Sequence, residues 1–147
     1  MPQAIDDYRH QGMRRKLIDL LRRKGIHDAA VLEAMMAVPR HLFIDDTAFL
    51  EMAYVDQAFP IGCGQTISQP YTVAFQTQLL GARKGDKVLE IGTGCGYQTA
   101  VLSAMGTRVV SIERHLPLHV DTKARLHRLG YKANLVYGDG FKGAPGH

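Results

Sequence analysis

The residues of this sequence whose types and spacing are most suited to chemistry lie in Lys87–Gly96. An apolar run there ends in the carboxylate of Glu90 and is followed by three glycines at alternate positions, Gly92, Gly94 and Gly96. A strand that ends in a glycine-rich turn and leads into a helix is typical of a nucleotide-cofactor site in an open α/β sheet. Glycine lets the backbone turn tightly and leaves room for a ligand. We expect free N–H groups at the start of the next helix to point at that ligand.

The spacing of the three glycines separates two kinds of ligand. Dinucleotide-binding loops usually read G-x-G-x-x-G, because a pyrophosphate must be held at the helix start. This loop reads G-x-G-x-G and follows a carboxylate, Glu90. A carboxylate repels a phosphate and attracts a cation. The pattern therefore favours a ligand with positive groups, and the ammonium and sulfonium of S-adenosylmethionine fit that polarity.

Two further carboxylates follow at positions that match such a site. A predicted second strand, Arg108–Glu113, ends in Glu113, about 20 residues beyond the first glycine, where a carboxylate can accept hydrogen bonds from both ribose hydroxyls. A third strand, Ala133–Tyr137, leads into Gly138–Gly140, where Asp139 could meet the adenine amino group. Plain turns and solvated strand ends can look the same. Three matches in order nevertheless predict the fold of class I S-adenosylmethionine-dependent methyltransferases.

Length and composition are those of an ordinary globular domain. At 147 residues, with 46% apolar and 22% charged residues, the chain can bury a substantial core. No apolar run approaches the roughly 18 residues that cross a bilayer, and Met1–His10 is polar, so we expect neither a membrane segment nor a signal peptide. Cys63 and Cys95 lack a C-x-x-C partner and a metal-ligand pattern, which predicts reduced thiols in a cytoplasmic protein.

The formal net charge of +4 is concentrated on two predicted helices. Basic residues crowd the first helix between Arg14 and Lys24, and the second carries Lys123, Arg125 and Arg128. Such clusters can bind nucleic acid, but a charge run on an amphipathic helix is more often its solvated face. Because the clusters lack interleaved aromatic residues for base stacking, we expect no nucleic-acid partner.

The N-terminal part of the chain is predicted to be helical. Leucines at helical spacing indicate an amphipathic helix over about residues 11–24, and Asp28 is a plausible N-cap of a second helix that ends before Pro39. A third short helical piece is expected around Thr47–Tyr54. His41 has no second ligand or carboxylate near it in the sequence, so we interpret it as a structural histidine.

Residues 56–70 contain residues that interrupt regular elements, namely Pro60, Gly62, Gly64 and Pro70. A polar segment of this kind, just before the cofactor unit, has the character of a loop that covers substrate or cofactor, although a plain connector has the same composition. A helix over residues 71–80 follows. We therefore predict a helical and loop region, 1–81, followed by the first half of an α/β domain, 82–147.

Several blocks of the sequence resemble protein-L-isoaspartate O-methyltransferase. These blocks are Val38–Phe43, Ala53–Asp56, Pro60–Tyr71 and the glycine motif through Gly138–Gly140. The run Gln-Thr-Ile-Ser-Gln-Pro within them is specific to this family, whereas the glycine motif belongs to class I methyltransferases at large. The resemblance covers nearly the whole chain from about Val31 onward. One small departure is Gln78, where family members often carry an acid.

The resemblance implies a protein repair methyltransferase. Such an enzyme moves a methyl group from S-adenosylmethionine to the carboxylate of an L-isoaspartyl residue in a damaged protein, and the ester then collapses to a succinimide. The substrate carboxylate is already ionised near neutral pH, so no general base is required and positioning must supply the catalysis. Ser68 matches the family's active-site serine and is expected to orient that carboxylate by a hydrogen bond. Another class I methyltransferase and an inactive truncated fragment are the alternatives.

The cofactor expected is S-adenosylmethionine, without a metal. Its predicted site consists of Thr66, Gln69, Glu90, Gly92, Gly94, Gly96, Glu113, Arg114, Asp139 and Gly140.

The resemblance also implies strands beyond His147. Family members arrange the first three parallel strands of a Rossmann-like sheet in the spatial order 3-2-1 and pair a fourth strand with the first. We therefore expect the N-terminal half of that sheet, with one edge of Lys87–Ile91 open. An open apolar edge pairs readily with another chain. On this reading the chain is a poor catalyst and either self-associates through Lys87–Ile91 or comes from a longer protein.

Overall fold

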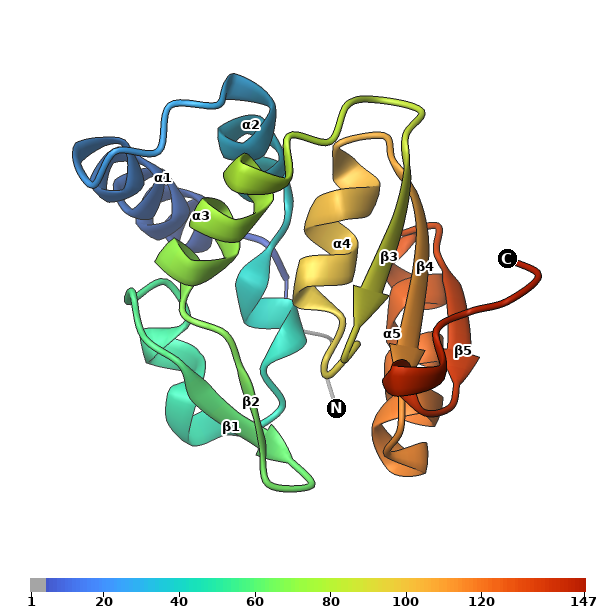
Figure 1. Cartoon of the computed structure of the whole chain (residues 1–147). Coiled ribbons are helices and arrows are strands. Elements are labelled where there is room, and N and C mark those ends of the chain that lie inside the picture. The colour runs from blue at the N-terminus through green and yellow to red at the C-terminus, as the bar shows by residue number, and fades with distance from the viewer. Residues whose placement is uncertain (1–4) are drawn as a thin grey trace.

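The computed structural model describes residues 5–147. The elements of its N-terminal part, which lie on the left of Figure 1, include α1 (Tyr8–Arg23), α2 (Ala29–Ala37), two short 3-10 helices, η1 (Arg40–Phe43) and η2 (Thr47–Met52), and α3 (Pro70–Leu80). The side chain of Asp28 accepts a hydrogen bond from the N–H of Ala30, which confirms Asp28 as the N-cap of α2. Among the described residues, no helix combines the length and the apolar character needed to span a bilayer.

A three-stranded parallel sheet forms the second part of the chain. Its elements in order are β3 (Lys87–Ile91), α4 (Tyr97–Ala104), β4 (Arg108–Glu113), α5 (Leu116–Leu129), β5 (Asn134–Tyr137) and the 3-10 helix η3 (Gly140–Lys142). The strand order is β3-β4-β5, so β4 lies in the centre, and all its residues after Arg108 are buried. Central parallel strands are covered on both faces and read as continuous apolar runs. The predicted α/β fold with three parallel strands in the order 3-2-1 is confirmed.

Helices α4 and α5 cover one face of this sheet. Both crossovers run in the same direction, and right-handed connections of that kind put their helices on the same side. Where α4 begins, Gly96 lies so close to α5 that a Cβ would be 2.7 Å from Cγ2 of Thr122. On the other face, Leu89 and Ile91 of β3 are 50% and 57% exposed. Within residues 5–147, β3 pairs with β4 alone, so its outer edge is open.

Residues 56–70 are more regular than predicted. They contain an antiparallel hairpin of β1 (Phe59–Gly62) and β2 (Gln65–Ile67), which lies apart from the main sheet in Figure 1. Phe59 pairs with Ile67, and both side chains are buried. The turn Gly62–Gly64 has φ values of 107°, 51° and 67°, a backbone that glycine adopts readily and that suits tight hairpins. The prediction that this segment lacks regular elements was wrong, because its glycines form the turn that joins two strands.

The larger hydrophobic core crosses the boundary predicted at residue 81. It combines Leu21 of α1 and Val31 and Met35 of α2 with Ala100 and Val101 of α4, all of them at most 1% exposed. Helix α2 packs against both α1 and α4. The division into a helical and loop region, 1–81, and an α/β region, 82–147, therefore stays a prediction. The two regions share this core.

Candidate functional site

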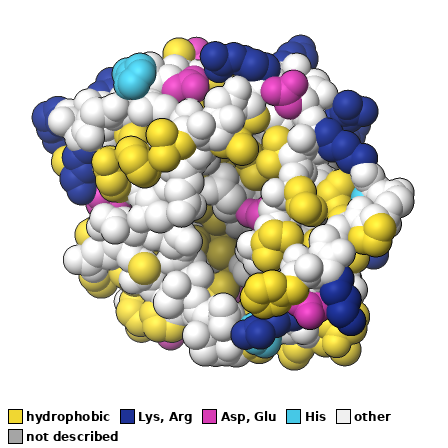
Figure 2. All heavy atoms as spheres, viewed as in Figure 1, with side chains coloured by type: hydrophobic (Ala, Val, Ile, Leu, Met, Phe, Trp, Pro, Cys, Tyr) yellow, Lys and Arg dark blue, Asp and Glu magenta, His cyan; other side chains and the backbone are white. Residues whose placement is uncertain are grey.

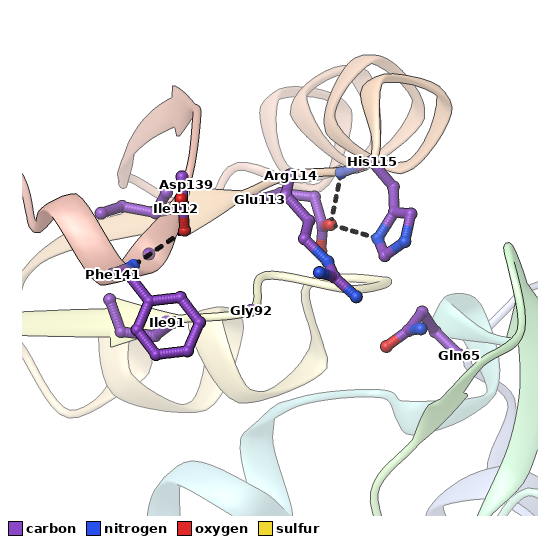
Figure 3. A pocket seen from close by; sticks show the side chains of 10 residues that line it. Gln65, Ile91, Gly92, Ile112, Glu113, Arg114, His115, Asp139 and Phe141 are labelled. Atoms are coloured by element: carbon purple, nitrogen blue, oxygen red, sulfur yellow. Dashed lines mark hydrogen bonds and ion pairs between the residues drawn. The ribbon is translucent and has the colours of Figure 1, made fainter.

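A pocket of about 530 Å³ lies at the carboxyl ends of the parallel strands. Its lining residues are Gln65, Ile91, Gly92, Ile112, Glu113, Arg114, His115, Asp139, Gly140 and Phe141. The space-filling view shows a hollow in the middle of this face (Figure 2). From β2, Gln65 faces Arg114 and His115 across the pocket (Figure 3). Open α/β sheets bind their ligands at this edge, which makes the pocket the candidate site.

Glu113, the last residue of β4, is held in the lining by three groups of the protein. The backbone N–H of Gly94 donates to its Oε1 at 2.9 Å, and the backbone N–H and ring Nδ1 of His115 lie 2.8 and 2.9 Å from its Oε2. Burial alone would raise the pKa of Glu113, but the bonds from the N–H groups of His115 and Gly94 outweigh it and lower the pKa. The carboxylate is therefore ionised near neutral pH, and its remaining lone pairs can accept bonds from a ligand.

Glu90 does not line the pocket. Its Oε1 accepts hydrogen bonds from the hydroxyls of Thr99 at 2.5 Å and Ser111 at 2.6 Å, and Ser111 is in turn 2.6 Å from the hydroxyl of Thr93. Burial raises the pKa of Glu90 to about 7 although both hydroxyl bonds lower it, and the charge of Glu113 adds to the rise. In this position Glu90 ties β3 to β4, α4 and the glycine loop.

The N–H groups of the three glycines in the loop donate hydrogen bonds to acceptors within the protein. Gly92 donates to the carbonyl of Ile112 at 2.8 Å, and Gly96 donates to the carbonyl of Thr93 at 3.0 Å. Gly94 donates to Glu113, as described above. The N–H groups of these three glycines are therefore not free for a ligand, and the expectation of free N–H groups at the start of the next helix, α4, stays a prediction. Of the three, Gly92 alone lines the pocket.

One end of the pocket combines apolar walls with an acid. Ile91, Ile112 and Phe141 line it, and Oδ1 of Asp139 accepts a hydrogen bond from the N–H of Phe141 at 3.0 Å. Gly140 sits against Ile91 so closely that a Cβ would lie 2.3 Å from Cγ2 of that side chain. A slot of this shape suits a flat, largely apolar ring that carries an amino group near the acid.

The wall opposite the sheet comes from the hairpin, and its contact residue is Gln65. Side chains alternate along a strand, so Thr66 points away from the face that carries Gln65, and it does not line the pocket. Ser68 is exposed just after β2, and its carbonyl accepts a hydrogen bond from Arg40 at 2.9 Å. Gln69 is the N-cap residue of α3 and is half-buried.

The structure brings part of the predicted site together. The predicted cofactor residues in the pocket lining are Gly92, Glu113, Arg114, Asp139 and Gly140, and those outside it are Thr66, Gln69, Glu90, Gly94 and Gly96. Sequence reasoning missed Gln65, Ile91, Ile112, His115 and Phe141. The two isoleucines carried a signal, because each stands beside a predicted residue at a strand end. Within residues 5–147, no group of three or more His, Cys, Asp or Glu side chains could hold a metal ion.

Comparisons with known proteins agree on a family. The sequence model described as Protein-L-isoaspartate(D-aspartate) O-methyltransferase matches residues 12–147. The chain belongs to this family. A relative named Protein-L-isoaspartate O-methyltransferase from Cytophaga hutchinsonii is 60% identical over 94% of the chain, and one of the same name from Christiangramia forsetii is 56% identical over 95%. The chain spans 62% of the first of these relatives and 66% of the second.

Solved structures show the same fold. A protein titled protein-L-isoaspartate O-methyltransferase superposes with a TM-score of 0.82 at 34% identity, over 90% of the chain and 44% of that protein. A protein from Plasmodium falciparum, titled a putative member of the family in complex with S-adenosyl-L-homocysteine, has a TM-score of 0.71 at 22% identity, over 90% of the chain and 66% of that protein. At that identity, the second likeness concerns the fold alone.

Proposed function

We propose that this chain binds S-adenosylmethionine in the pocket and forms part of a protein-L-isoaspartate O-methyltransferase that repairs damaged proteins. The observation that carries the proposal is the pocket itself, which combines an ionised carboxylate, Glu113, with the apolar slot beside Asp139. Membership of the family and the names of the relatives support it. The Plasmodium falciparum protein shares the fold and is titled as a complex with S-adenosyl-L-homocysteine, so a protein of this fold binds such a ligand.

The lining residues fit the parts of this cofactor. Glu113 would accept hydrogen bonds from the ribose hydroxyls, since a carboxylate at the end of the second strand suits a diol. The slot formed by Ile91, Ile112 and Phe141 would hold the adenine ring, with Asp139 near its amino group. A volume of about 530 Å³ lies in the ordinary range for cofactor sites.

The proposed reaction makes modest demands on this chain. When bound, the cofactor supplies an electrophilic methyl group, which is attached to a sulfonium. The nucleophile is the substrate's own carboxylate, which is ionised near neutral pH and needs no base. The protein must orient that carboxylate and exclude water. Ser68 would donate a hydrogen bond to it, and its exposed position after β2 leaves it open to a carboxylate carried by another protein.

Ligand binding and methyl transfer test this proposal separately. In calorimetry we expect the chain to bind S-adenosylhomocysteine and to ignore NAD. Methyl transfer to an isoaspartyl peptide should be measured with the chain and with a version extended by the C-terminal third of the Cytophaga hutchinsonii relative. Transfer to the isoaspartyl peptide but not to its aspartyl twin supports the proposal. Binding of S-adenosylhomocysteine without such transfer by either protein would favour another class I methyltransferase, and absent binding would leave an inactive fragment.

Ser68→Ala should lower turnover on the isoaspartyl peptide in whichever of these proteins is active. Loss of one hydrogen bond to a charged group costs about 1.5–3 kcal/mol, which is roughly a 10- to 150-fold loss of rate if the bond is made in the transition state. The affinity for S-adenosylhomocysteine should stay constant, because the lost bond goes to the other substrate. Ser103→Ala is the matched control, since Ser103 lies in α4 and accepts a bond from the N–H of Lys132. Turnover equal to the unmodified protein would reduce Ser68 to a structural role.

We also propose a cytoplasmic location, which the free thiols of Cys63 and Cys95 support.

We further propose that copies of the chain associate through the open edge of β3. The exposed Leu89 lies on the uncovered face of that strand. Leu89→Lys should reduce the mass found by light scattering, because a charge on an edge strand opposes pairing. Val120→Lys removes an equally exposed apolar residue from α5 and serves as control. A monomeric wild-type chain would contradict the proposal.

A further inference from the structure

A buried cation, Arg40, lies between the two parts of the chain that form the pocket walls. Its side chain is 0% exposed. Among residues 5–147, no carboxylate forms a salt bridge with it. Burial lowers the pKa of Arg40, yet a guanidinium stays protonated near neutral pH. A buried charge without an acid is costly unless other groups of the protein satisfy it, so the partners that Arg40 does have are informative.

On one side, Arg40 binds three backbone carbonyls of the segment that leads into and out of the hairpin. Its Nε donates to Ala53 at 2.9 Å, and its Nη2 donates to Gln57 at 3.1 Å and to Ser68 at 2.9 Å. Gln57 precedes β1 and Ser68 follows β2. One guanidinium therefore joins both ends of the hairpin whose strand β2 carries Gln65.

On the other side, Arg40 lies over the ring of Tyr97, with Cζ 4.8 Å from the ring centroid. Tyr97 is the first residue of α4 and directly follows the glycine loop. A guanidinium over an aromatic face is attracted to it, more strongly when both are desolvated, and Tyr97 is buried. The same side chain thus contacts the hairpin that supplies one wall of the pocket and the helix start that follows the other wall.

We propose that Arg40 is a positioning residue that holds the hairpin wall, with Gln65 and Ser68, against the glycine-loop wall of the cofactor pocket. This inference rests on the proposed function in one respect, namely that the pocket binds S-adenosylmethionine. The planar fork of arginine suits the task, because it offers several fixed donors and a flat face at once, whereas lysine offers a compact ammonium. Arg40 touches no pocket atom itself and acts through the segments that it joins.

The test compares Arg40→Lys with Arg14→Lys in the full chain. Arg14 is also a buried arginine; it donates to the carbonyl of Met36 at 2.6 Å and to the hydroxyl of Tyr54 at 2.8 Å, away from the pocket. Both variants should lose stability. In Arg40→Lys alone, the amides of residues 57–68 should exchange with solvent roughly 10-fold faster than in the unmodified chain, beyond the change in global exchange. Its affinity for S-adenosylhomocysteine should fall about 10-fold, and that of Arg14→Lys should stay within about twofold.

The exchange measurement needs no ligand, so it separates this inference from the proposed function. If the unmodified chain fails to bind S-adenosylhomocysteine, the proposed function fails, but hydrogen exchange still tests whether Arg40 holds the hairpin in place. Equal exchange of residues 57–68 in the two variants would overturn the inference. Should Arg40→Lys not fold, Tyr97→Leu replaces it, because that change removes the aromatic face and keeps an apolar side chain. Faster amide exchange confined to residues 57–68 in Tyr97→Leu would support the positioning role of Arg40. Exchange that changes only in step with global stability would overturn it.

Discussion

Replacing Glu113 with alanine should weaken the binding of S-adenosylhomocysteine by about 1.5–3 kcal/mol, or roughly 10- to 150-fold. The change removes the proposed acceptor for the ribose hydroxyls. It also removes the acceptor of the N–H groups of Gly94 and His115, which fixes the glycine loop beside the pocket. Both effects act in the same direction. Calorimetric titration of the chain with S-adenosylhomocysteine measures the loss.

Two further variants make the Glu113 result specific. Glu113→Gln keeps one oxygen acceptor but turns an NH₂ group toward a donor, so its affinity should lie between those of the alanine variant and the unmodified chain. Glu33→Ala removes an exposed acid from α2 and should leave affinity unchanged. Thermal unfolding checks that each variant is folded. An alanine variant that is folded and binds as well as the unmodified chain would remove Glu113 from the site.

The unmodified chain should lose stability as the pH rises from 4.5 to 7 because of Glu90, and Glu90→Gln should remove this loss. Burial raises the pKa of Glu90 to about 7 from an ordinary 4.5. In that window the unfolded chain releases the proton before the folded chain does, so ionisation of Glu90 favours unfolding. The stability is fully present below pH 4.5 and is lost as the pH passes 7. The shift corresponds to about 3 kcal/mol.

Urea unfolding between pH 4.5 and 8 gives the free energy of unfolding of both proteins, and the difference between them measures the contribution of Glu90. The amide oxygen of glutamine can still accept the bonds from Thr99 and Ser111, which keeps the comparison conservative. His41 titrates in the same window with the opposite sign, because burial lowers its pKa and its neutral form favours the folded chain at higher pH. Both proteins contain His41, so its effect cancels in the difference. A difference that is constant over this range would show that Glu90 stays ionised in the folded chain.

The sequence predicted the elements well because their signals are local. Asp28 before α2 and the apolar runs of the three strands each act through neighbouring residues. Strand order followed from the resemblance to a known fold. The hairpin was missed because its pairing of Phe59 with Ile67 spans a turn, and prolines and glycines near it suggested only interruption.

The candidate site was predicted in part for a different reason. Residues at strand ends, such as Glu113 and Asp139, line the pocket because topology alone brings the carboxyl ends of parallel strands together. The direction of each side chain is a finer matter. Glu90 turns into the protein to meet two hydroxyls, and Gln65 faces the pocket where Thr66 was predicted, because a shift of one residue along a strand reverses the face. Tertiary packing sets these directions, and residue type alone does not specify them.

The shared core has a consequence for the order in which the chain takes shape during synthesis. Helices α1 and α2 leave the ribosome early, but the surface that Val31 and Met35 bury is completed by Ala100 and Val101 of α4. Translation adds only about 5–20 residues each second, so these apolar faces wait for seconds without their partner. During that interval the nascent chain offers them to solvent or to chaperones. The N-terminal helices can therefore settle only once the glycine loop and the helix behind it have been made.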